Sequence, residues 1–273
     1  MLENNEKMLR LRRMEAVARQ AGAIMTDRPV ARVEEKSAFN FVTELDMAVN
    51  TYLAEALPSL VPHSVVVSEE TSARDYRFEH PTWIVDPVDG TTNLIYGANQ
   101  SAVSICLVEN GRPAAGVVYN PFADEMYSAY AGGGACLGGL PIAPRPDAFL
   151  RESLIGFGTS PYNKQLFLDD MPMLAAVFAE CIDLRRSGSA ALDLCYVACG
   201  RLTGFFERWL RPWDYAAGMV ILSEAGATIC TFDGSAPDIA HSSSIVAGNG
   251  RIQEELLSLI LPFAVQGTNP PRG

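Results

Sequence analysis

The stretch WIVDPVDGTTN, residues 83–93, places two aspartates, Asp86 and Asp89, around a proline and directly after an apolar run. A residue before a proline favours an extended backbone, so we expect Asp86 to finish a strand and Pro87 to end its pairing. Asp89 would then lie on a turn, and Gly90 would let the backbone approach a ligand closely. The same residues could also form an ordinary surface turn, because Asp, Pro and Gly are common in turns.

Two carboxylates at the buried end of a strand need compensating positive charge, because burial and mutual repulsion both penalise their ionised form. Hard divalent cations with oxygen ligands, such as Mg²⁺, provide that charge. Thr91, Thr92 and Asn93 follow the aspartates and are good N-cap residues, so we expect a helix to begin there. The free N–H groups at such a helix end favour a phosphate. The stretch therefore predicts a combined metal and phosphate site.

Other carboxylates close apolar strands or begin apolar helices. Glu69 and Glu70 follow the apolar run SVVVS, residues 64–68. Asp214 begins the apolar segment WDYAAGMVILSEAG, residues 213–226, where it could also act only as a helix N-cap. Strand-end and helix-start carboxylates together would form a cage for more than one metal ion.

Composition and charge limit the classes of function. The chain has 273 residues, 48% hydrophobic and 19% charged, which is typical of a soluble globular protein of one large domain or two packed halves. A net charge of −11 argues against binding the nucleic-acid backbone, although metal ions could still bring an anionic substrate to acidic residues. No apolar run approaches the roughly 20 residues of a membrane span, and the first residues lack the apolar segment of a signal peptide. We therefore expect a cytoplasmic location and no membrane partner.

Cysteines and histidines are not expected to carry the chemistry. The six cysteines form no CxxC pair, so we interpret them as reduced and mostly buried small hydrophobic residues. The three histidines are expected to be surface or structural residues: His63, His80 and His241.

The pattern of apolar residues predicts an α+β protein with two different halves. Apolar spacings of three and four predict a helix over residues 8–25, and Thr43 can cap a second helix. Asn110-Gly111 lies between two strand-like runs and predicts a hairpin. We expect an antiparallel-rich half over residues 1–145 and an α/β half over residues 146–273, where strands and helices alternate.

Several segments together resemble the inositol monophosphatase family of Mg²⁺-dependent, lithium-sensitive phosphatases, and in particular its bacterial enzymes. SEET with WIVDPVDGTTN resembles the first family signature, and WDYAAGMVILSEAGA resembles the second. KSAFNFVTELD, residues 36–46, resembles the segment with the family's lysine and its Thr/Asp pair. With SGSAALDLCYVACGRLTGFFE, the resemblance covers nearly the whole chain and implies a layered αβαβα sandwich of the sugar-phosphatase type.

The resemblance implies a role for individual residues. Residues that match ligands of two to three Mg²⁺ ions are Glu69, Asp86, the carbonyl of Val88, Asp89 and Asp214. Asp46 and Thr91 match the pair that orients the attacking water beside Glu69, and Glu70 and Lys36 match residues behind the ligands. Gly90 and Thr91 match the phosphate-holding loop, and the matches to positions that contact the sugar or inositol are Gly188, Ser189, Ala190 and Glu207. Glu207 could instead form a salt bridge with Arg208 or Arg211.

Two segments depart from the family pattern. The segment before Thr43 usually carries an aspartate where this chain has Asn40 and Phe41, which puts the loop with Lys36 in question. Trp209, Leu210 and Arg211 replace residues that are commonly small or polar near the substrate, and we expect them to reshape specificity.

The expected function is Mg²⁺-dependent hydrolysis of a small phosphate monoester, inositol monophosphate or a similar polyol or sugar phosphate, by metal-activated water. Alternatives with the same mechanism are fructose-1,6-bisphosphatase, 3′(2′),5′-bisphosphate nucleotidase and histidinol-phosphate phosphatase. An alternative of another class is a non-catalytic partner of transcription complexes. The resemblance also implies a homodimer, for which the apolar strands between residues 101 and 131 are candidate interface strands.

Overall fold

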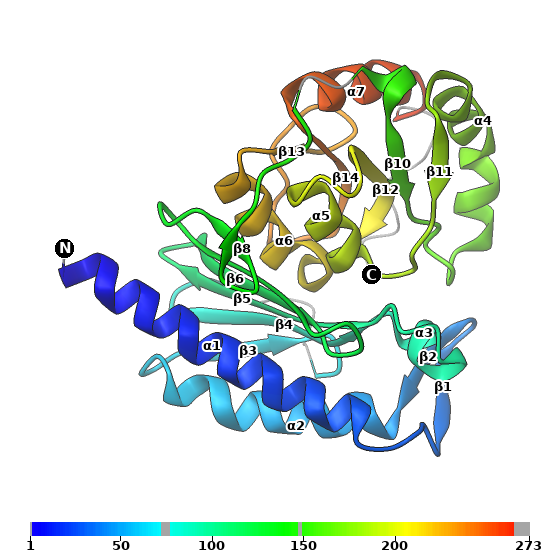
Figure 1. Cartoon of the computed structure of the whole chain (residues 1–273). Helices are drawn as coiled ribbons and strands as arrows, with labels where there is room; N and C mark the ends of the chain where they lie inside the picture. Colours follow the sequence, from blue (N-terminus) through cyan, green and yellow to red (C-terminus); the bar gives the residue numbers. More distant parts are fainter. Residues whose placement is uncertain (1, 72–76, 147–148, 265–273) are drawn as a thin grey trace.

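The computed structural model describes residues 2–71, 77–146 and 149–264 (Figure 1). Its helices are α1 (Leu2–Thr26), α2 (Glu44–Ala56), α3 (Thr91–Tyr96), α4 (Lys164–Glu180), α5 (Ala190–Ala198), α6 (Pro212–Ala225) and α7 (Gly250–Ala264). Strands of the first half are β1 (Val33–Ser37), β2 (Asn40–Thr43), β3 (Val65–Ser68), β4 (Thr82–Asp89), β5 (Ala102–Glu109), β6 (Arg112–Asn120), β7 (Glu125–Tyr130), β8 (Ala135–Leu137) and β9 (Leu140–Pro141). Strands of the second half are β10 (Leu154–Phe157), β11 (Asp183–Arg185), β12 (Gly204–Leu210), β13 (Thr228–Cys230) and β14 (Ser243–Gly248).

The elements form alternating layers of helices and sheets. Figure 1 shows α1 and α2 on one face of the larger sheet, α5 and α6 between the two sheets, and α4 and α7 beyond the smaller sheet. The resulting order, helix, sheet, helix, sheet, helix, is the sandwich expected from the resemblance. Among the described residues, no helix combines the length and apolar character needed to cross a bilayer.

The larger sheet has seven strands in the order β3-β4-β5-β6-β7-β8-β9, and all its neighbours are antiparallel except β3 and β4. The hairpin at Asn110 and Gly111 is present, with both residues at positive φ (52° and 72°), as its short turn requires. One expectation is wrong: Pro87 does not end strand β4, which continues to Asp89 through a register shift against β5. Such a bulge accommodates a residue that lacks an N–H donor.

The smaller sheet has five strands in the order β11-β10-β12-β14-β13. Strand β10 is parallel to β11 and β12, whereas β14 is antiparallel to β12 and β13. Strands and helices alternate along this half, as the sequence pattern predicted, whereas the three-residue edge strand β11 and the β1–β2 hairpin were not predicted.

The two halves share buried side chains. One core cluster joins Ile84 and Tyr127 of the larger sheet to Leu194 and Tyr215 of the central helices. A Cβ atom at Gly116 would lie 2.5 Å from the carbonyl oxygen of Ala217, so strand β6 and helix α6 approach too closely for any other residue without a shift. Each half also has a core cluster of its own, one within residues 11–130 and one within residues 150–263, but the shared cluster crosses residue 145, so a boundary there stays a proposal.

The apolar side chains of strands β5, β6 and β7 are buried within the protomer. These strands occupy interior positions of the seven-stranded sheet and are buried along most of their length. Helix α1 contacts them on one face and α6 on the other. Their apolar character is thus explained by the core, and they are not the free interface strands that we expected for a dimer.

Candidate active site

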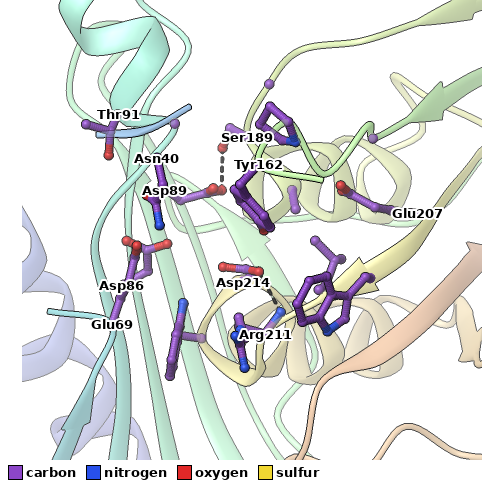
Figure 2. Close-up of a pocket in the computed structure, with 18 of the residues that line it drawn as sticks. Asn40, Glu69, Asp86, Asp89, Thr91, Tyr162, Ser189, Glu207, Arg211 and Asp214 are labelled. Carbon is purple, nitrogen blue, oxygen red and sulfur yellow. Dashed lines mark hydrogen bonds between the residues drawn. The ribbon is translucent and has the colours of Figure 1, made fainter. Parts of the chain in front are cut away.

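A cavity of about 1380 Å³ opens between the two halves and collects most of the predicted site residues. The predicted residues that line it are Lys36, Glu69, Asp86, Val88, Asp89, Gly90, Thr91, Gly188, Ser189, Ala190, Glu207 and Asp214. Asp46 and Glu70 lie behind this lining and are hydrogen-bonded to it. In Figure 2 the carboxyl groups of Asp86, Asp89 and Asp214 point towards the same space.

Asp86 and Asp89 stand at the carboxyl end of β4, where they are 2% and 8% exposed. The Val88 N–H donates to Asp86 Oδ1 at 3.0 Å, which fixes the bulge around Pro87. Asp214 lies in the first turn of α6, and its Oδ2 accepts the Arg211 N–H at 2.7 Å. Asp214 is not the N-cap residue, a position that Arg211 occupies, but it caps the helix from the third position of the first turn and also lines the cavity.

Asp89 joins the two halves directly. Its Oδ2 accepts the Ser189 hydroxyl at 2.6 Å and the Ala191 N–H at 2.7 Å, at the start of α5 (Figure 2). Ser189 also caps α5, since its Oγ accepts the Leu192 N–H at 3.3 Å. The Ser189 hydroxyl, predicted to contact substrate, is thus already bonded to a carboxylate in this structure.

The carboxylates are held in a field that opposes their ionisation. Burial, followed by the charges of Glu69, Asp89 and Asp214, raises the pKa of Asp86 well above its usual range. Burial, followed by the charges of Asp89 and Glu69, does the same to the pKa of Asp214. Burial raises the pKa of Asp89 to about 6, against the hydrogen bonds from Ser189 and α5. A cation in the cavity would remove this penalty.

This donor set suits a hard cation, although the side chains are not clustered tightly. All four side chains are carboxylates, whose hard oxygen donors match the preference of Mg²⁺. The His241 imidazole also lines the cavity, but its Nδ1 is paired with Asp238. In the part of the chain that the structure describes, no three His, Cys, Asp or Glu side chains converge into a ready metal site. The residues present therefore fit Mg²⁺ by their chemistry and burial, and their assignment as ligands stays a proposal.

The hairpin before Thr43 keeps its lysine at the site despite the Asn40 departure. Lys36 Nζ lies 2.6 Å from Glu70 Oε1 and 3.1 Å from Glu69 Oε1. Phe39 adopts a positive φ of 63° in the turn, and Asn40 lines the cavity. The shorter hairpin thus delivers Lys36 to the two glutamates, where its charge opposes the pKa rise that burial causes in Glu69.

Thr91 and Asp46 form a pair at the edge of the cavity. Thr91 Oγ1 donates to Asp46 Oδ1 at 2.8 Å, and the Thr43 N–H donates to Asp46 Oδ2 at 2.9 Å in a capping box of α2. The predicted N-cap of the following helix is wrong: Gly90, with a φ of 92°, occupies that position. Asn93 instead donates to the carbonyl oxygens of two loops, as its Nδ2 lies 2.6 Å from Gln100 O and 2.9 Å from Ser187 O.

Glu207 is buried at 7% exposure on β12 and faces the cavity. Neither proposed salt bridge is formed: Arg208 Nε lies 2.5 Å from Asp170, and Arg211 stacks over the Trp209 ring at 4.9 Å. Glu207 Oε1 instead accepts the Ser160 N–H at 3.0 Å and faces the Ser160 hydroxyl at 3.3 Å. Burial raises the pKa of Glu207 to about 7, against the Ser160 hydrogen bond.

Sequence reasoning missed one wall of the cavity. Tyr162 packs edge-on against Trp209 with ring centroids 6.1 Å apart, and Arg186 and His241 also line the cavity. His241 is exposed, and its Nδ1 lies 2.8 Å from the Asp238 carboxylate. No motif marks these residues, although the proximity of Tyr162 to SLIGFG, residues 153–158, at a strand end was an available signal.

The proteins that this chain resembles include Nus factors and inositol monophosphatases (IMPases). The model of the inositol monophosphatase family matches residues 6–262. Nus factor SuhB of Escherichia coli K12 is 36% identical over 245 residues, which are 88% of this chain and 91% of SuhB. The IMPase of Thermotoga maritima superposes with a TM-score of 0.84 at 28% identity, over 93% of this chain and 97% of its own.

A second solved structure was determined with a ligand. Staphylococcal IMPase-II with inositol monophosphate bound superposes with a TM-score of 0.77 at 29% identity, over 92% of each chain. Together with the match over residues 6–262 and the carboxylate-lined cavity, these likenesses establish that the chain belongs to the inositol monophosphatase family, whose members are metal-dependent phosphatases of small phosphorylated substrates.

Proposed function

We propose that the protein is a Mg²⁺-dependent phosphatase that hydrolyses inositol monophosphate or a similar small polyol phosphate. The observation that carries this proposal is the convergence of Asp86, Asp89 and Asp214 on one cavity, in a field that opposes their ionisation. A site that binds two or three cations would make such an arrangement favourable.

Residues of both halves would hold the ions. The proposed ligands are Glu69, Asp86, the carbonyl of Val88, Asp89 and Asp214. Bound Mg²⁺ would lower the pKa of the attacking water and stabilise the negative charge of the leaving alkoxide. Lys36 would hold Glu69 and Glu70 in place through its contacts at 3.1 and 2.6 Å.

We infer that the Thr91–Asp46 pair would orient the attacking water. Thr91 Oγ1 donates its only proton to Asp46 at 2.8 Å, so its lone pairs can accept a hydrogen bond from water. Asp46 is 1% exposed, and its second oxygen is fixed by Thr43. A water held by Thr91 would therefore present an oxygen lone pair to the phosphorus atom, beside Glu69.

The remaining cavity residues would bind the substrate. Gly90 and Thr91 lie beside the proposed ligands and would contact the phosphate. Gly188, Ser189 and Ala190 border the same space, and Glu207 would accept hydrogen bonds from hydroxyl groups of the leaving alcohol. The staphylococcal relative with bound inositol monophosphate supports a polyol phosphate as the substrate.

A hydrolysis screen tests this proposal. The purified protein is assayed for phosphate release from inositol 1-phosphate, fructose 1,6-bisphosphate, adenosine 3′,5′-bisphosphate and histidinol phosphate, with Mg²⁺ and with excess EDTA. Asp214→Asn is the inactive control. We expect the largest kcat/KM for inositol phosphate, only with Mg²⁺. A larger value for another ester would assign the protein to that alternative, and equal rates in EDTA would refute the metal mechanism.

A second role in transcription complexes is suggested by the 36% identity to a Nus factor. With a net charge of −11, such a role would use protein contacts in preference to the nucleic-acid backbone. Affinity purification of transcription complexes with the parent and with Asp214→Asn would test it, since a scaffold role does not need hydrolysis. A homodimer and a cytoplasmic location remain part of the proposal.

A further inference from the structure

The carboxylate of Glu207, which lines the cavity, contacts residues 158–160, a segment outside the family motifs. Residues 158–160 follow β10 and run alongside β12, where the Gly158 N–H donates to Phe206 O at 3.1 Å. Ser160 is 3% exposed, and its N–H donates to Glu207 Oε1 at 3.0 Å; its hydroxyl, which has one proton, lies 3.1 Å from Trp209 O and 3.3 Å from Glu207 Oε1. Among the hydrogen bonds of the described residues, none reaches Glu207 Oε2.

The backbone of Ser160 is held in an unfavourable conformation. Its φ is +41°, although it is not a glycine and it precedes Pro161. A residue before proline normally adopts an extended conformation, and a left-handed backbone costs about 1 kcal/mol or more for an L-residue. The Ser160 carbonyl accepts the Asn163 N–H at 2.8 Å, which closes the turn. The strained turn directs the Ser160 N–H at Glu207 Oε1 and places the Ser160 hydroxyl between that oxygen and Trp209 O.

Gly158 leaves room for the carboxylate. A Cβ atom at this position would lie 1.8 Å from Glu207 Oε2 and 2.0 Å from its Cδ. The carboxylate therefore lies directly against the Gly158 backbone, and any larger residue must displace it. Glu207 is thus fixed by two separate contacts, the Ser160 N–H on Oε1 and close packing on the Oε2 side.

We propose that Gly158 and Ser160 are positioning residues that set the selectivity for a polyol leaving group by fixing the Glu207 carboxylate. The Ser160 N–H holds Oε1, and the Gly158 backbone packs on the Oε2 side of a carboxylate that lines the cavity. The proposal rests on the function given above. A carboxylate that rotates freely would lose this selectivity, because the hydroxyl-bearing substrate is favoured only when the acceptor is already in place.

Kinetics with two substrates test the proposal. Ser160→Ala and Gly158→Ala are compared with the parent on inositol 1-phosphate and on p-nitrophenyl phosphate, which has no hydroxyl groups. Ser160→Ala removes the hydroxyl beside Glu207 Oε1, and since a lost hydrogen bond to a charged group corresponds to roughly tenfold, we expect KM for inositol phosphate to rise by up to about tenfold. Gly158→Ala forces the carboxylate itself to move, so its KM should rise at least as much. KM for p-nitrophenyl phosphate should change far less. Equal losses on both substrates would overturn the proposal.

Two matched controls separate positioning from general damage. Ser153→Ala removes a hydroxyl that is fully buried in the same half and bonded to Phe149 O at 2.8 Å. Gly156→Ala adds a Cβ in β10 that would meet Leu202 at 2.8 Å, without lining the cavity. Both controls should show thermal shifts like those of the test variants and keep the parent's ratio of the two KM values. A changed ratio in the controls would overturn the proposal.

A double-mutant cycle shows whether Ser160 acts through Glu207. In a Glu207→Ala background, the additional Ser160→Ala change should leave KM for inositol phosphate unaltered, because the group being positioned is gone. Additive losses would refute the proposal.

A crystal structure of Gly158→Ala provides a readout without substrate. We expect the Glu207 carboxylate to move away from its parental position, and an unmoved carboxylate would overturn the proposal even if the enzyme proves to hydrolyse another ester. Absence of any Mg²⁺-dependent hydrolysis in the parent would instead refute the proposed function alone.

Discussion

Replacing Asp89 by asparagine should separate what this residue does for the fold from what it does for the reaction. Asparagine keeps the shape of the side chain, and its Oδ1 can still accept from the Ser189 hydroxyl and the Ala191 N–H. Only the negative charge is lost. The variant Asp89→Asn therefore tests the charge with little change in packing.

The pKa of Asp89 sets the size of the stability effect in metal-free protein. A carboxyl pKa of about 6 in the folded chain, against 3.8 as the reference, corresponds to about 3 kcal/mol. The folded protein retains the proton to higher pH than the unfolded chain, so this group lowers stability as pH rises from about 4 to about 6. Above about pH 6 the Asp89 carboxyl of the folded parent is ionised, and the full loss of stability, about 3 kcal/mol, is present. At pH 7.5 in EDTA, Asp89→Asn should melt at the same temperature as the parent or higher.

Activity should change in the opposite direction. Charge stabilisation in a metal site contributes several kcal/mol, so we expect kcat to fall at least about a hundredfold. Mg²⁺ should also raise the melting temperature of the variant less than that of the parent, because the variant binds the ions more weakly.

A matched control is Asp170→Asn, which lies outside the cavity. Asp170 is 7% exposed and pairs with Arg208 at 2.5 Å, so its loss leaves a buried cation without its partner. This control should melt lower than the parent and keep most of its activity and its stabilisation by Mg²⁺. The reasoning would be refuted if Asp89→Asn melted far below the parent in EDTA, or if it retained most of its activity.

Three further predictions can be checked directly. Hydrolysis should require Mg²⁺ and be inhibited by Li⁺ at high concentration, and full turnover in excess EDTA would contradict the oxygen-ligand site. Glu207→Ala should raise KM for a polyol phosphate much more than for p-nitrophenyl phosphate, with a smaller fall in kcat; equal losses would make Glu207 a structural residue. Sedimentation at micromolar concentration should give a homodimer, and a monomer would count against that expectation.

The sequence predicted those helices and turns that are stabilised by contacts between residues a few positions apart. Thr43 caps α2 through a side chain that is two and three residues from its partners, and Asn110-Gly111 forms its hairpin from two residues of positive φ. Strand β11 has only three residues and is held by its pairing with β10, so its cause lies far along the chain. Pro87 was misjudged for the same reason, since β5 allows a bulge that the local sequence does not reveal.

Site residues were predictable where a motif marks them and not elsewhere. The carboxylates at the ends of β3 and β4 follow apolar runs, and Asp214 lies at the start of the apolar helix α6, which makes unpaired charge conspicuous. The partners of Asp89 and Glu207 are less visible, because Ser189 is 100 positions from Asp89 and Ser160 is 47 from Glu207. Only the fold brings such polar residues together, and an isolated serine has no periodicity to reveal it.

The geometry of the proposed metal site depends on packing some distance from the cavity. Asp89 belongs to the larger sheet and is bonded to the start of α5, whereas Asp214 begins α6, which packs against β5 and β6 of the same sheet. The close approach of Gly116 to Ala217 fixes how near α6 lies to that sheet. The separation between Asp89 and Asp214 therefore depends on how α5 and α6 pack against the larger sheet. For this reason the carboxylates can stay near one another against their repulsion: the buried core between the halves holds them there, and a cation that relieves the repulsion would also strengthen the contact between the halves.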